Sequence, residues 1–86
     1  MGKLDNMLVM ILSGASDQNV LFADLCWLLK RLRFDERIRG SHHIFTRADI
    51  AEIINLQPRG KHAKAYQVKQ VRHIMLKYKL GGHHAE

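Results

Sequence analysis

The chain has 86 residues, of which 47% are hydrophobic, and it carries a formal net charge of +6 at neutral pH. The length predicts one domain over residues 1–86, and the hydrophobic content argues against a disordered chain. The positive charge favours an acidic partner such as nucleic acid, an anionic membrane or an acidic protein. A single cysteine, Cys26, excludes an internal disulfide, and its apolar neighbours predict a buried thiol.

The first half of the chain predicts two helices. Apolar residues recur at helical spacing from Lys3 to about Leu12, so we assign an N-terminal helix to residues 1–15. Asp17 is a favourable N-cap for a second helix, which we expect to run to about Leu32. No apolar run reaches the length of a membrane span and the first residues do not resemble a signal peptide. We therefore expect a cytoplasmic protein that does not enter the membrane.

A hairpin is predicted next. Phe34 to Arg39 has the composition of a strand, Gly40-Ser41 suits a tight turn, and a second strand follows from His42 to about Arg47. Because side chains alternate along a strand, His42 is expected on one face of the sheet and His43 on the other.

The second half continues as turn, strand and helix. The stretch from Ala48 to Gln57 is ambiguous: Asp49–Glu52 is compatible with a helical turn, and we interpret Ile53–Leu56 as a third strand. We expect a final helix from about Ala65 to Lys79, with residues 81–86 as a flexible tail. The predicted fold class is α+β, with a small three-stranded antiparallel sheet covered by helices on one face. Five basic residues in or near the final helix are expected on faces other than its buried face: Lys64, Lys69, Arg72, Lys77 and Lys79.

Acid–base chemistry on a polyanion is indicated by a histidine among basic residues, since its side chain gains and loses a proton near neutral pH. RNA supplies its own nucleophile, the 2′-hydroxyl, so a single histidine acting as base or acid can assist cleavage without a metal ion. We expect no cofactor and no metal site, because the adjacent His42 and His43 point to opposite faces.

The run Gly40-Ser41-His42-His43-Ile44-Phe45, after a helix and an arginine-bearing strand, resembles the HicA family of toxin–antitoxin mRNA interferases. The similarity extends from about Phe22 to Leu80, so residues 17–80 form a HicA-like core and the N-terminal helix is additional. The resemblance implies a fold like that of double-stranded-RNA-binding domains and an endoribonuclease that cleaves single-stranded mRNA. It also implies a HicB-type antitoxin that holds the enzyme inactive.

The resemblance assigns catalysis to His42, with His43 as the second candidate. Charge and expected nearness to the hairpin make Arg37, Arg39 and Lys61 candidates for binding RNA phosphates, and the Ser41 hydroxyl is another. Basic positions near the closing helix add two more candidates for RNA binding, Lys64 and Lys69.

Two other functions compete with a ribonuclease toxin. A non-catalytic RNA-binding module would share the fold and the basic surface but would not turn over RNA. An adaptor domain would use the basic surface to bind an acidic protein. Three roles remain open for the additional N-terminal helix: it could form a homodimer, dock on the core or bind the antitoxin.

Overall fold

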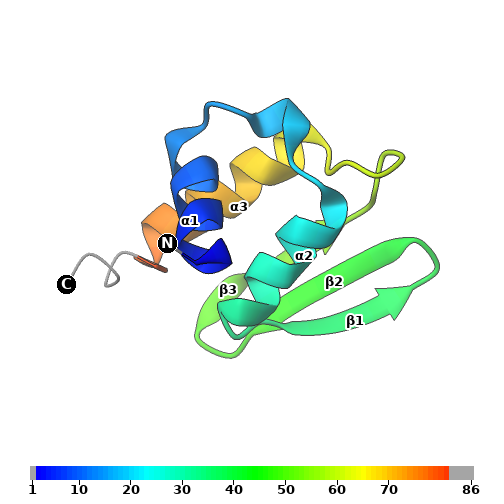
Figure 1. Cartoon of the computed structure of the whole chain (residues 1–86). Coiled ribbons are helices and arrows are strands. Elements are labelled where there is room, and N and C mark those ends of the chain that lie inside the picture. Colours follow the sequence, from blue (N-terminus) through cyan, green and yellow to red (C-terminus); the bar gives the residue numbers. More distant parts are fainter. Residues whose placement is uncertain (1, 82–86) are drawn as a thin grey trace.

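The computed structural model describes residues 2–81, which form four helical segments and three strands (Figure 1). In chain order these are α1 (Lys3–Ser13), the short 3-10 helix η1 (Asp17–Asn19), α2 (Phe22–Arg31), β1 (Asp35–Arg39), β2 (His42–Arg47), β3 (Ile50–Leu56) and α3 (Ala65–Lys77). Within these described residues, every helix is too short or too polar to cross a membrane.

The three strands make one antiparallel sheet in the order β1-β2-β3. Gly40 turns the β1–β2 hairpin with a φ of 58°, a left-handed conformation that glycine adopts without strain. Phe45, Ile54 and Leu56 are buried under the helices, whereas no helix of the described residues 2–81 covers the opposite face of the sheet (Figure 1). The α+β prediction, with helices on one face of a small antiparallel sheet, is confirmed.

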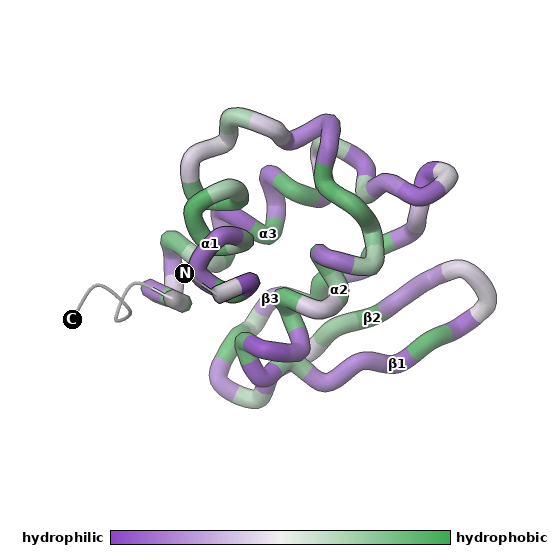
Figure 2. The backbone as a smooth tube through the Cα atoms, viewed as in Figure 1, coloured by the Kyte–Doolittle hydropathy of each residue, from purple (hydrophilic) through white to green (hydrophobic). Residues whose placement is uncertain are grey.

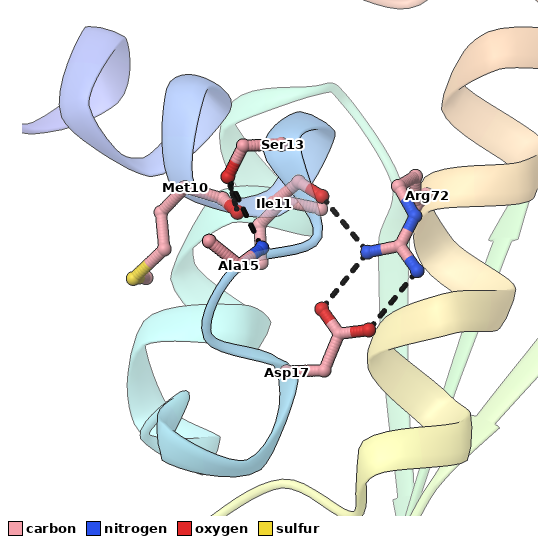
Figure 3. A network of polar contacts seen from close by, with 6 residues as sticks. All are labelled: Met10, Ile11, Ser13, Ala15, Asp17 and Arg72. Atoms are coloured by element: carbon pink, nitrogen blue, oxygen red, sulfur yellow. Dashed lines mark hydrogen bonds and ion pairs between the residues drawn. The ribbon is translucent and has the colours of Figure 1, made fainter.

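The additional helix α1 docks on the core. Met7, Leu8 and Ile11 are buried, and an ion pair fixes the end of the helix (Figure 3). The Arg72 guanidinium of α3 donates to both carboxylate oxygens of Asp17, at 2.8 and 3.0 Å, and to the Ile11 carbonyl at 3.1 Å. Arg72 is half-buried, and its side chain joins α3 to α1 and η1, which precede it by 55 residues or more.

The second helix begins at Phe22 and not after Asp17. After η1, Val20 and Leu21 are extended because they pair with the loop before α3: the Ala63 N–H donates to the Val20 carbonyl, and the Phe22 N–H donates to the Lys61 carbonyl, both at 2.9 Å. Asp17 opens η1 and pairs with Arg72, so it does not cap α2.

The third strand begins at Ile50, so Asp49–Glu52 does not form a helical turn. Ile50, Ile54 and Leu56 are buried while alternate residues are exposed, which is the two-residue period of a strand with one covered face. α3 ends at Lys77, two residues before the predicted end, because Lys79 is left-handed with a φ of 57°. Of the predicted flexible tail, residues 82–86 lie outside the described part of the chain.

Candidate active site

His42 lies at the start of β2, on the face of the sheet that the helices leave open. Its partner across the hairpin is Arg39, and side chains directly opposite one another in an antiparallel pair have Cβ atoms about 4.5–5.5 Å apart. Most of β1 is hydrophilic along its length (Figure 2). The open face therefore presents an exposed imidazole beside a guanidinium.

Asn55 of β3 orients the His42 ring. The Asn55 Oδ1 lies 3.1 Å from His42 Nδ1. An amide oxygen only accepts hydrogen bonds, so this contact requires a hydrogen on Nδ1 and leaves the lone pair of the neutral ring on Nε2. Sequence analysis missed Asn55, although an asparagine inside an apolar strand is itself a signal, since strands are depleted in asparagine.

The His42 hollow is a surface pocket of about 210 Å³ lined by His42, Asn55, Gln57, Tyr66 and Gln67. Ser41 stands at its side, where its Oγ accepts a hydrogen bond of 3.0 Å from Gln57 Nε2. This bond uses an oxygen lone pair and leaves the Ser41 hydroxyl hydrogen available to a ligand. Polar groups from the hairpin turn, two strands and a helix thus converge on one imidazole.

The first turn of α3 forms one wall of the hollow. Gln67 is 1% exposed and is the one polar residue in the core among residues 2–81. Its Oε1 accepts a hydrogen bond of 3.2 Å from the backbone N–H of Lys64. Its Nε2 is buried and has no hydrogen-bond partner within the described chain.

His43 lies on the opposite face, beneath α2, as the alternation predicted. Its Nδ1 is 2.7 Å from Glu36 Oε2, and its ring meets Phe22 edge to face with centroids 4.9 Å apart. The other Glu36 oxygen pairs with Lys30 Nζ at 2.7 Å. Hydrogen bonds from His43 and then Lys30 are the main causes that hold the pKa of Glu36 below its ordinary value.

Cys26 completes this helix-facing cluster. Burial raises the pKa of its thiol to about 11, which confirms the predicted buried thiol and disfavours the nucleophilic thiolate. Potential metal-ligating atoms of Cys26, Glu36 and His43 lie within 4.8 Å of one another, a grouping that sequence spacing did not suggest. Both Glu36 oxygens already have cationic or imidazole partners, so the contacts serve to hold α2 against the sheet.

The predicted RNA-binding residues fall into two groups. Three of them lie near the His42 hollow. Arg39 is opposite His42 in the hairpin, Ser41 precedes His42 in the chain, and the Lys64 N–H donates to Gln67. The other group lies further away. Arg37 is exposed two residues along β1, and Lys61 is exposed in the loop before α3. The hydrogen bond from Arg72 is the main cause that lowers the pKa of the Asp17 carboxyl, and the charge of the nearby Lys69 adds to it.

Comparisons of the chain with models of known protein families, with curated proteins and with solved structures found no match.

Proposed function

We propose that this protein is a metal-independent endoribonuclease of the HicA type, an mRNA interferase toxin, with His42 as its proton-transfer group. The observation that carries the proposal is the His42 imidazole, held by Asn55 in a polar hollow and flanked by Arg39. The Gly-Ser-His-His motif supports the same conclusion, since its first histidine is the one on the open face. The helix–three strands–helix order from α2 to α3 is also the order that the HicA resemblance implies.

The chemistry begins at the ribose. His42 Nε2 takes the proton of the 2′-hydroxyl as its oxygen attacks the adjacent phosphorus, and the bond from phosphorus to the 5′-oxygen breaks. The products are a 2′,3′-cyclic phosphate and a 5′-hydroxyl: the leaving 5′-oxygen takes a proton from solvent water, and the protonated His42 returns its proton to solvent. Arg39 and the Ser41 hydroxyl stabilise the negative charge that builds on the phosphate oxygens.

A non-catalytic RNA-binding module is the second candidate. Tyr66 favours RNA binding in either case, because its side chain is 63% exposed at the edge of the His42 hollow. An exposed aromatic ring can stack on an unpaired base. The RNA therefore approaches as a single strand, with a base on Tyr66 and a phosphate beside His42.

A HicB-type antitoxin is the partner that the family resemblance adds to this proposal. Its target is the open face of the sheet, where Arg37 and Arg39 border the exposed Ile53. A partner that covers this face would also block the His42 hollow.

The test uses labelled single-stranded RNA, a chelator, the wild-type protein and the His42→Ala variant. We expect fragments ending in 2′,3′-cyclic phosphate from the wild type alone, and no cleavage at a linkage whose 2′-hydroxyl is replaced by hydrogen. If both proteins bind RNA and neither cleaves it, the non-catalytic RNA-binding module replaces the ribonuclease as the better supported function. Cleavage of a fully deoxy strand would overturn the mechanism.

A further inference from the structure

Three local features at the start of α3 contradict the usual rules for a stable helix end. The N-cap residue is Lys64, although the positive end of the helix dipole favours acidic or neutral capping residues. The Lys64 side chain does not cap the first turn, and that turn contains no acidic residue; its one side-chain cap is Gln67 Oε1, which accepts from the Lys64 N–H. The third feature is the buried Gln67 Nε2 without a partner.

One bound group would compensate for all three features. A phosphate at this turn would accept hydrogen bonds from backbone N–H groups that have no acceptor within the helix. It would neutralise the cation at the N-cap, and one of its oxygens would accept from Gln67 Nε2. Tyr66 and Gln67 belong to this turn and line the same hollow as His42, so the group would lie beside the imidazole.

We propose that the first turn of α3 binds the RNA phosphate at which the chain is cleaved, and that Gln67 Nε2 donates a hydrogen bond to a non-bridging oxygen of this phosphate. Its Oε1 already accepts from the Lys64 N–H, so the buried Nε2 is the end of the amide that has no partner, and the phosphate would reach it from the hollow that Gln67 lines. The inference rests on the proposed ribonuclease function for the identity of the phosphate. Gln67 is then a residue that binds and positions substrate, selected at a cost in stability.

The experiment measures binding without cleavage. The probe is a short single-stranded oligonucleotide of 2′-fluoro ribonucleotides, which has RNA-like phosphates but lacks the nucleophilic hydroxyl. Titrated into ¹⁵N-labelled protein, it should shift the Gln67 side-chain amide resonances, and inorganic phosphate alone should shift them less. A shift with free phosphate but none with the oligonucleotide would overturn the assignment to RNA.

Gln67→Met separates ligand binding from stability. The variant keeps the length of the side chain but removes both the buried unpartnered donor and the acceptor of the Lys64 N–H, so the two effects on stability oppose one another and its thermal midpoint should stay close to that of the wild type. Its affinity for the oligonucleotide should fall about tenfold, the value of one lost hydrogen bond to a charged group. The matched control is Gln70→Met on the same helix and outside the hollow, which should bind like the wild type.

A second variant, Gln67→Glu, keeps an oxygen for the Lys64 N–H but presents a negative group to the phosphate. It should bind the oligonucleotide more weakly than Gln67→Met does. Unchanged affinity in both variants overturns the inference and leaves the ribonuclease proposal standing. If the wild type never cleaves RNA but the oligonucleotide still shifts the Gln67 amide resonances, the phosphate-binding proposal stands and the catalytic proposal fails.

Discussion

The two faces of the sheet place adjacent histidines in opposite chemical surroundings. His42 is exposed on the open face, and its ring has one amide partner, Asn55. His43 is packed under α2, where Glu36 binds its Nδ1 and Phe22 lies against its ring. The two side chains have the same intrinsic chemistry, so the difference between them comes entirely from the pleat of β2.

Under the proposed function, this difference separates a catalytic role for His42 from a structural role for His43. A proton-transfer group needs access to substrate and a free nitrogen, and His42 has both. A histidine held by a carboxylate between a helix and a sheet is suited to a structural role. The four predictions that follow test the separation, beginning with the largest expected effect.

Substituting each histidine by alanine should give opposite results. His42→Ala should lower the rate of RNA cleavage by about 10²–10⁴-fold, the usual contribution of one general acid or base, and leave the thermal midpoint nearly unchanged. His43→Ala should keep cleavage within a few-fold of the wild type and lower the midpoint. Rates and melting curves measured on the same preparations check both halves. If His43→Ala abolishes cleavage while the fold survives, the assignment of the two faces is reversed.

Arg72→Met tests what contacts within the helical layer contribute to stability, and it changes no contact of either histidine. It leaves the Asp17 carboxylate, whose side chain is 11% exposed, without its bidentate partner and frees the Ile11 carbonyl. We expect a loss of about 2–3 kcal/mol in the free energy of unfolding, measured in urea at neutral pH.

The control for Arg72 is Lys77→Met. It removes an ion pair with Glu52 in which the Lys77 side chain is 52% exposed, so water screens the pair and its effect should be much smaller than that of Arg72→Met. If the free energy of unfolding falls equally in the two variants, burial of the Asp17–Arg72 ion pair adds nothing to its contribution to stability. Cleavage rates should be unchanged in both.

The helix-facing cluster should respond to acid through Glu36. Its folded-state pKa lies below the ordinary value of 4.5, so the carboxylate stabilises the fold above about pH 4.5, and this contribution is lost as the pH falls through the lowered value. Glu36→Gln should therefore cost about 1–2 kcal/mol at pH 7 and progressively less below pH 4.5. Urea unfolding at a series of pH values measures the difference, with the exposed Asp35→Asn on the same strand as control. A cost that is independent of pH would contradict the role assigned to the ion pair.

Much of the fold could be predicted because its signals are local. Alternation placed His42 and His43 on opposite faces, and helical spacing found α1 and α3 to within a few residues. The errors arose where a distant segment decides the conformation. Asp17 has the chemistry of an N-cap, but a partner 55 residues later takes its carboxylate.

The candidate site was predictable only in part, for the same reason. A motif could point to His42, but Asn55 and Gln67 reach it from the third strand and the last helix. Which residues meet across strands depends on register, and the third strand was predicted three residues too short at its start. Without that register, nothing in the sequence indicated which amide would meet which imidazole.

Asn55 gives the smallest effect and the most specific test of the open face. Asn55→Ala removes the acceptor that keeps a hydrogen on His42 Nδ1, so part of the population adopts the tautomer with its lone pair turned away from the substrate. We expect cleavage to slow by about five- to tenfold, since one neutral hydrogen bond is worth about 1 kcal/mol. Asn55→Asp keeps an acceptor in place and should recover part of the rate. The exposed Ile53→Ala on the same strand face controls for disturbance of β3. If Asn55→Ala cleaves like the wild type, the ring needs no orienting partner, and the advantage of His42 over His43 reduces to exposure alone.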